Sequence, residues 1–271
     1  MQLAIEIVKP SVELVTPAEW LPQMAKIIEY CGRLCHKTEG LAGEKTDGFI
    51  RKVARKLRHE SIEEHSSICF HFVGSRSFSH QLVRHRLNAI SQESQRYCDY
   101  SNSKYGNCLK VLCPPNIAEV PDGLVAYADF DDETGWPKNQ GAEGGPLTLS
   151  YEHHASSVMP PLLVGPAILA NKRFVRWAIT ALRCYWQYLT DRAEGVPAED
   201  AREALQNACK TEVAFSASAR QWRHVIAMRC DKHAQWQIRG LATDVLRILN
   251  EHMPACFGDL AEKFLGPEID S

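Results

Sequence analysis

Residues 66–73, SSICFHFV, alternate with a period of two, and this stretch most limits what the chain can fold into. Ile68, Phe70 and Phe72 point to one side of an extended backbone, and the residues between them point to the other. Such alternation is typical of a half-buried strand, whose apolar side has to be covered by other elements. The sequence therefore predicts at least one sheet strand here.

The other segments predict a chain of both strands and helices. A first strand is expected at residues 1–8 and ends at Pro10. Residues 103–160 are rich in proline and glycine and carry the acidic run DFDDETGW, which predicts an irregular insertion and not a core element. Helical patterns are expected at 17–36, 46–58, from Ser77 into the RHR segment, 166–190, 197–209, 216–229 and 233–252, where Pro254 stops the last one.

Composition narrows the class of protein. The chain has 271 residues, of which 45% are hydrophobic, and 31 basic against 33 acidic side chains give a net charge of −2. This balance argues against a general nucleic-acid binder. The N-terminus does not read as a signal peptide, and no apolar stretch of about 18 residues predicts a membrane span. The ten cysteines form no CxxC pair, so we expect reduced thiols and a cytoplasmic location.

The segment HESIEEH, residues 59–65, superficially resembles a zinc-binding HExxH motif. His59 and His65 are six residues apart, about 120° around a helix, whereas two ligands on one face need a spacing of three or four. No metal site is therefore predicted. Two interpretations stay open: a surface turn before the strand, or a polar rim in which Ser61 and Glu64 bind a ligand.

The segment QLVRHRLNAISQESQRY, residues 81–97, gathers cations in a nearly neutral protein. On a helix, Gln81, Arg84 and Asn88 share a face, while His85 and Arg86 point elsewhere. The planar guanidinium suits phosphate oxygens, and the SQES stretch adds neutral donors. A solvated charged face and a phosphate site are both compatible with this pattern.

A third cationic block, SASARQWRHVIAMRCDKHAQWQIR, covers residues 216–239. On a helix, Arg220, Arg223 and His224 lie on one side. Arg229 is nine residues from Arg220, half a turn away, and is expected to face a different pocket. Arg202, in AREAL, is one more isolated cation.

Together the three blocks resemble the flavin-dependent thymidylate synthases: RHR followed after seven residues by Ser94 and then by Arg96 and Tyr97, HESIEEH upstream, and ARQWRHVIAMRCDKHAQWQIR downstream. The resemblance implies an α/β fold with a mixed, mainly antiparallel sheet and flanking helices. It implies a single domain over residues 1–271 that forms a homotetramer, with each active site between subunits. Such enzymes make thymidylate from deoxyuridylate (dUMP), with methylenetetrahydrofolate as carbon donor and NADPH-reduced FAD as hydride donor.

Position by position, the resemblance also implies a set of site residues. Arg229 is the expected catalytic cation, because a guanidinium stays charged and can stabilise an anion on the uracil ring. The residues expected to bind FAD are Ser61, Arg84, His85, Arg86, Gln92, Ser218, Ala219, Arg220 and His224. Those expected to bind dUMP are Gln81, Leu82, Val83, Arg84, Gln92, Glu93, Ser94, Gln95, Arg96, Arg202 and Arg229, with Gln92 to Arg96 supplied by another subunit.

Three residues depart from the family pattern: Gln92 replaces a common glutamate, Gln206 a common proline, and His224 an asparagine. Two other functions compete with the flavin enzyme. A thymidylate synthase with a cysteine nucleophile would use Cys98, although a packing role suits this thiol better. A nucleic-acid-binding module would use the RHR segment and would need no flavin, which the net charge of −2 disfavours.

Overall fold

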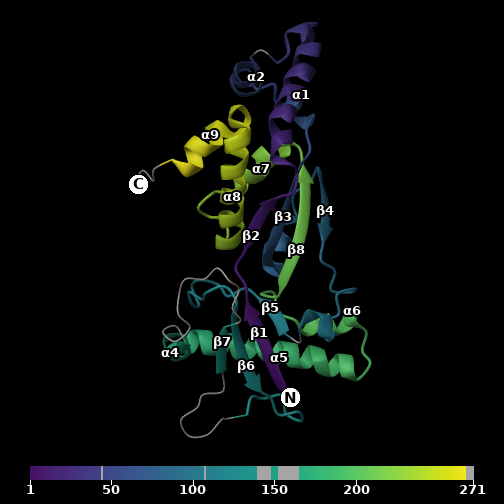
Figure 1. Ribbon diagram of the computed structural model, residues 1–271, viewed down its shortest axis with the longest axis vertical. Coiled ribbons are helices and arrows are strands. Elements are labelled where there is room, and N and C mark those ends of the chain that lie inside the picture. The colour runs from purple at the N-terminus through teal and green to yellow at the C-terminus, as the bar shows by residue number, and fades with distance from the viewer. Residues whose placement is uncertain (44, 107, 139–147, 152–164, 267–271) are drawn as a thin grey trace. The chain divides into compact units, whose positions relative to one another are not determined.

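The computed structural model describes residues 1–43, 45–106, 108–138, 148–151 and 165–266, and the chain folds into two compact units (Figure 1). Each unit is assembled from three separate stretches of the chain. Unit 1 comprises Met1–Lys9, Gly74–Ser77 and Glu93–Thr211, and unit 2 comprises Pro10–Val73, Phe78–Gln92 and Glu212–Ser271. The single domain expected over residues 1–271 stays a prediction.

Unit 1 is built on a four-stranded sheet in the order β5-β1-β6-β7. β1 runs parallel to β5 and antiparallel to β6, which is antiparallel to β7. The long helix α5 packs against β1 and β6 and buries Tyr185 and Tyr188 in the core of the unit. The elements of unit 1 are β1 (Gln2–Ile7), β5 (Cys108–Val111), β6 (Leu124–Asp129), β7 (Thr148–Tyr151), α4 (Gly165–Ala170), α5 (Lys172–Ala193) and α6 (Ala198–Ala201).

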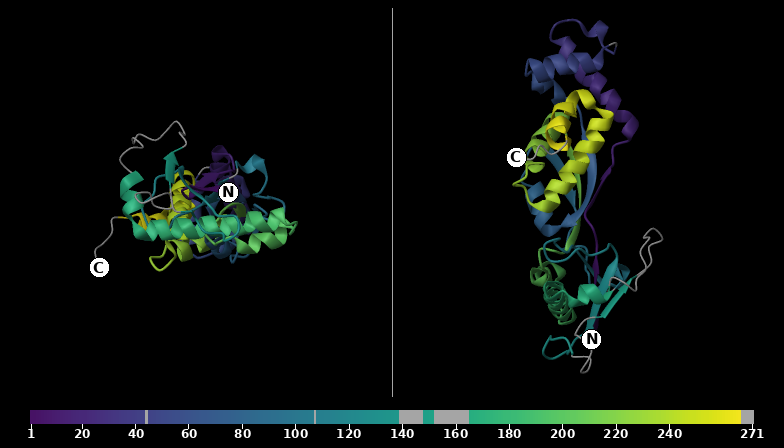
Figure 2. Two further views of the ribbon diagram at one scale, coloured as in Figure 1. Left: turned by 90° about the horizontal axis from the view of Figure 1, so that it is seen from below. Right: turned by 90° about the vertical axis from the view of Figure 1, so that its left-hand side faces the viewer.

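Unit 2 is built on a second four-stranded sheet, in the order β2-β3-β8-β4. β2 pairs antiparallel with β3, and β8 pairs antiparallel with β4. Helices α8 and α9 pack against each other, as Figure 1 and the right-hand view of Figure 2 show. The elements that lie wholly or mostly in unit 2 are β2 (Ser11–Leu14), α1 (Leu21–Leu34), α2 (Thr46–Ile50), β3 (Ile68–Ser75), α3 (Arg76–Leu82), β4 (Asn88–Gln92), β8 (Lys210–Ala217), α7 (Ala219–Arg229), α8 (Trp236–His252) and α9 (Pro254–Leu265).

A buried tryptophan fixes α7 on the sheet of unit 2. Trp222 packs edge-on against Phe70 at 5.1 Å and lies 5.0 Å from Phe215, between ring centroids. Its indole N–H donates to the carbonyl of Ile68 at 2.9 Å, so its polar atom is satisfied although the side chain is 1% exposed. Truncating such a residue costs about 3–5 kcal/mol. The helix therefore has little freedom to move against the strands.

The mixed α/β fold with mainly antiparallel pairing is confirmed, and so is the strand predicted from residues 66–73. β8 was not predicted, although its burial alternates along all eight residues. The predicted helix at 197–209 is wrong beyond Ala204, because a short helix and a 3-10 turn end there and the turn residues 205–209 connect them to β8. Pro254 does not only stop α8: it is the first residue of α9.

Residues 103–160 are less irregular than the sequence predicts. β5 and β6 lie on either side of β1, and Leu109, Val111 and Ala126 are buried. These two strands are only four and six residues long, so their alternation of buried and exposed side chains is too short to stand out between the surrounding prolines and glycines. The interpretation of 103–160 as no core element is thus wrong for these strands, while 139–147 and 152–160 lie outside the described residues.

Two findings concern the cysteines and the question of membrane-spanning helices. All ten cysteines are free thiols. Within the ranges that the structure describes, none of the helices combines the length and the apolar character that crossing a bilayer requires.

Candidate active site

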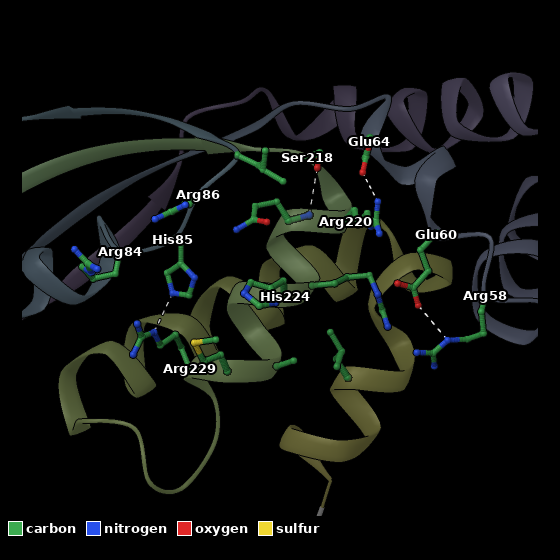
Figure 3. Close-up of a pocket in the computed structure, with 16 residues that line it drawn as sticks. Arg58, Glu60, Glu64, Arg84, His85, Arg86, Ser218, Arg220, His224 and Arg229 are labelled. Carbon is green, nitrogen blue, oxygen red and sulfur yellow. Dashed lines mark hydrogen bonds and ion pairs between the residues drawn. The ribbon is translucent and has the colours of Figure 1, made fainter.

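Unit 2 contains a cavity of about 1050 Å³ that opens between the RHR segment, the 3-10 turn Glu60–Glu64 and α7 (Figure 3). This volume is at the upper end of what small-molecule sites enclose. Cations dominate its wall. The arginines that line it are Arg58, Arg84, Arg86, Arg220, Arg223 and Arg229.

Helix α7 forms one wall of the cavity, as the sequence predicts. Ser218 caps the helix, and its Oγ accepts from the backbone N–H of Gln221 at 3.2 Å. Trp222 lies on the opposite side of the helix and is buried in the core. Arg220 and His224, which are four residues apart, therefore face the cavity. The expected common side of Arg220, Arg223 and His224 is confirmed, since all three line the cavity.

The RHR segment is a turn and not a helix, which corrects the sequence interpretation. Helix α3 ends at the buried Leu82, and Leu87 has a positive φ of 62°, a conformation in which no helix can continue. The side-chain amide of Asn88 donates to the carbonyl of His85 at 2.7 Å and closes the turn. The face expected for Gln81, Arg84 and Asn88 on one helix therefore does not exist.

In this turn Arg84 and Arg86 are exposed side chains that line the cavity (Figure 3). Neither of them forms an ion pair with any carboxylate in the described part of the chain, so both guanidinium groups are available to an anion. β4 pairs with β8 directly after the turn, which ties the turn to the sheet. The segment therefore presents two unneutralised cations from a fixed backbone.

His85 lies between these arginines but points inward, to Arg229 (Figure 3). The Arg229 Nε–H donates to His85 Nε2 at 2.9 Å, and Arg229 Nη2 donates to the carbonyl of Gln81 at 3.1 Å. Burial, and then the charges of Arg229 and His224, lower the pKa of His85 to about 4. The imidazole is therefore neutral at pH 7 and accepts through Nε2, which leaves the far side of the guanidinium free.

The expectation that Arg229 faces a different pocket from Arg220 is wrong. Both residues line the same cavity, because it extends along the whole of α7, from Ser218 to Arg229. Half a helical turn separates the directions in which their side chains leave the helix. Arg229 is the last residue of the helix, and its long side chain reaches across to His85.

The other three arginines of the cavity are paired with carboxylates. Arg58 Nε lies 3.3 Å from Glu60 Oε1, and Arg220 forms an ion pair with Glu64. Arg223 holds Asp259 with both Nη atoms, at 2.7 and 2.6 Å. Glu64 therefore lies on the cavity wall, as the polar-rim interpretation of HESIEEH expects. The wall also includes Arg58 and Glu60, which sequence patterns did not single out.

Several predicted residues lie elsewhere in unit 2. Ser61 is exposed and is not part of the cavity wall. Leu82 is 2% exposed and belongs to the core, so its side chain cannot touch a ligand, whereas Val83 is exposed. The N–H of Ala219 is engaged by Ser66 Oγ at 2.8 Å. The Gln92 amide donates to Ser79 Oγ at 2.9 Å.

The remaining predicted residues belong to unit 1. Glu93 accepts from the Tyr100 hydroxyl at 2.9 Å, and Arg96 pairs with Glu199 at 2.5 Å. Gln95 is buried, and Ser94 Oγ accepts from the N–H of Arg96 at 3.3 Å. Arg202 begins a 3-10 turn, Arg202–Ala204.

Known proteins resemble the chain over most of its length. A family model described as thymidylate synthase complementing protein matches residues 18–255. A flavin-dependent thymidylate synthase of Mycolicibacterium vanbaalenii is 29% identical over 239 residues, 87% of this chain and 79% of that protein. One of Geobacter sulfurreducens is 28% identical over 246 residues, 88% and 82% of the two chains.

A solved structure supports the fold. Thymidylate synthase X (ThyX) from Helicobacter pylori, in a crystal structure with FAD and dUMP, is 18% identical and covers 96% of this chain and 99% of its own, with a TM-score of 0.55. The family expected from the three sequence blocks is confirmed by the match over residues 18–255. The chain belongs to the thymidylate synthase complementing protein family, that of the flavin-dependent thymidylate synthases.

Proposed function

We propose that the protein makes thymidylate from dUMP by reductive methylation, with FAD bound in the arginine-lined cavity of unit 2. In this reaction the C5 hydrogen of dUMP leaves as a proton. A methylene carbon from methylenetetrahydrofolate replaces it, tetrahydrofolate is released, and a hydride completes the methyl group. The bound flavin, once reduced by NADPH, would supply that hydride. The family and its flavin-dependent relatives support the activity and the cofactor.

The cavity suits a polyanionic flavin nucleotide. Its volume of about 1050 Å³ admits a large ligand, and Arg84 and Arg86 offer planar donors that match phosphate oxygens. His224 and Ser218 line the same wall and offer hydrogen-bonding groups. We assign Arg84, Arg86, Arg220, Ser218 and His224 to FAD, in agreement with the sequence expectation.

The contact between Arg229 and His85 carries the proposal. The neutral imidazole accepts from Nε at 2.9 Å and so fixes the plane of the guanidinium without cancelling its charge. A fixed cation costs no reorganisation when negative charge develops on the uracil ring, at N3 or O4. Arg229 thereby stabilises the reacting pyrimidine, and His85 orients it.

We propose further that other copies of the chain complete the nucleotide site. Gln81 and Arg84 bind dUMP from one copy, and a second copy contributes Gln92 together with the unit 1 residues Glu93 to Arg96 and Arg202. A homotetramer satisfies this division, as the family resemblance implies. The ten free thiols suit a reducing compartment, which supports a cytoplasmic location.

Tritium release from 5-tritiated dUMP tests the function. The complete mixture of protein, FAD, NADPH and methylenetetrahydrofolate should release tritium to water, and omission of FAD or the folate should abolish the release. Purified protein should also show a flavin absorption band that is lost on denaturation. Folded, flavin-loaded protein that releases no tritium would contradict the assigned activity.

A further inference from the structure

Arg223 lines the cavity, yet none of the expected site residues accounts for it. Its guanidinium is bound on one side by the Asp259 carboxylate, through two hydrogen bonds of 2.7 and 2.6 Å, and it also donates to the carbonyl of Cys256. The side chain is 13% exposed. An arginine whose Nη donors are engaged in this way has little left to offer a phosphate.

A second carboxylate lies behind Arg223. Glu63 is fully buried, forms an ion pair with Arg55, and interacts electrostatically with Arg223. Burial raises the pKa of Glu63 despite both arginines, whereas the hydrogen bonds and charge of Arg223 outweigh burial and lower that of Asp259. Arg223 therefore lies between a buried carboxylate and one that is half exposed.

The four charged residues of this cluster come from four separate segments of the chain, which meet near the wall of the cavity. Arg55 comes from the helical segment Arg51–Lys56, Glu63 from the turn Glu60–Glu64, Arg223 from α7, and Asp259 from α9. Every one of these segments except Arg51–Lys56 also contributes a side chain to the cavity wall. Buried charges of this kind are costly unless they are paired, so removing one partner disturbs the others.

We propose that Glu63 and Asp259 are positioning residues of the cavity, which act through Arg223 to hold the FAD-facing side of α7 against α9. Arg223 is then part of the wall and not an anion ligand. The inference rests on the proposed function for its ligand, FAD. A direct phosphate contact by Arg223 is the competing interpretation, and the two predict opposite effects for Asp259.

A double-mutant cycle on the full-length protein separates them, with the FAD dissociation constant and the absorption spectrum of bound FAD as readouts. Arg223→Met and Asp259→Asn should each weaken FAD binding about five- to tenfold, and the double variant should be no weaker than either. Glu63→Gln should weaken binding in the same direction, and Asp259→Glu, which keeps the charge, should restore most of the affinity.

Arg247 and Asp244 on α8 provide the matched control, since they form an exposed ion pair of 2.5 Å outside the cavity wall. Arg247→Met and Asp244→Asn should leave FAD binding unchanged. If Arg223→Met weakens binding while Asp259→Asn leaves it unchanged or tightens it, Arg223 is an anion ligand and the proposal is overturned. Wild-type affinity in all variants overturns it as well.

Failure of the proposed function can be distinguished experimentally from failure of the positioning role. Wild-type protein that binds no FAD would contradict that function before any variant is compared. Hydrogen exchange would then still test the positioning role: Asp259→Asn should increase exchange of the α7 and first-turn α9 amides, and Asp244→Asn should not. Equal exchange in wild type and Asp259→Asn would overturn the positioning role independently of flavin.

Discussion

The arginines around the cavity form two groups, those with a carboxylate partner and those without one. The difference separates arginines that can bind an anionic ligand from arginines that stabilise the cavity wall. Arg84, Arg86 and Arg229 face no carboxylate in the described part of the chain, whereas Arg58, Arg220 and Arg223 are each paired with one. A guanidinium without a counter-ion can serve an anionic ligand, and a paired one mainly fixes the wall. The cation count of a site therefore overstates its capacity for anions.

Loss of Arg229, an arginine without a carboxylate partner in the described residues, should have the largest effect on activity. Arg229→Ala removes the one unpaired cation that His85 orients, so tritium release from dUMP should fall by about 10²- to 10³-fold. The flavin absorption band should remain, because the FAD-binding arginines are intact. Arg247→Ala, an exposed arginine on α8, is the control and should leave release unchanged. Full activity in Arg229→Ala would remove its catalytic role.

Arg84→Ala and Arg86→Ala should have the next largest effects. Charge-assisted hydrogen bonds contribute about 1.5–3 kcal/mol, so each variant should weaken FAD or dUMP binding by roughly 10- to 100-fold. The salt dependence of binding should also become shallower than in wild type. Arg51→Ala, exposed and outside the cavity wall, should bind as wild type does. Unchanged affinity in both RHR variants would mean that these cations are only a solvated face.

The lowered pKa of His85 makes the stability of the protein depend on pH. Its pKa is about 4 in the folded protein and near 6.5 when unfolded, so the unfolded chain takes up the proton first. This contribution to stability is complete above pH 6.5 and is lost as the pH falls toward 4. The melting temperature of His85→Gln should fall less between pH 7 and 4.5 than that of wild type, and exposed His36→Gln should follow wild type. Parallel curves for wild type and His85→Gln would contradict a neutral acceptor.

Glu64→Gln should convert a paired arginine into an unpaired one. The pair with Arg220 is about half exposed on both sides, so its loss should change the free energy of unfolding by less than about 1 kcal/mol. FAD binding should tighten about two- to threefold, as measured by fluorescence titration. Weaker binding would show that Glu64 contacts the ligand itself.

Cys98→Ala should have the smallest effect. Cys98 is a free thiol in unit 1 that packs beside the core, and no step of the proposed reaction uses it. Most of the tritium release should therefore survive. Loss of turnover while FAD stays bound would instead favour a cysteine nucleophile.

The sequence predicts where α7 and α8 end, at 229 and 252, because apolar residues recur there with helical spacing. It is wrong about where they begin, since α7 begins at 219 and α8 at 236, and residues 216–217 belong to β8. It predicts the residues of the RHR turn as candidates but not their arrangement, since the turn depends on the positive φ of Leu87 and on the pairing of β4 with β8. β8 was missed because its alternation continues directly into the helical pattern of α7. Neither the His85–Arg229 contact nor the Arg223–Asp259 pair leaves a periodic signal, because their partners are 144 and 36 residues apart.

The cavity extends along the whole of α7, so the peptide dipoles of this helix act on the same space as its side chains. The partial positive charge at the N-terminal end lies next to the Arg220–Glu64 pair, and the partial negative charge at the C-terminal end lies beside Arg229. The backbone field therefore favours anions where the side chains are neutralised and opposes them where the side chains are not. The helix dipole therefore offsets part of the difference in charge that the side chains create along this wall, so donor geometry as well as charge sets how an anion lies there.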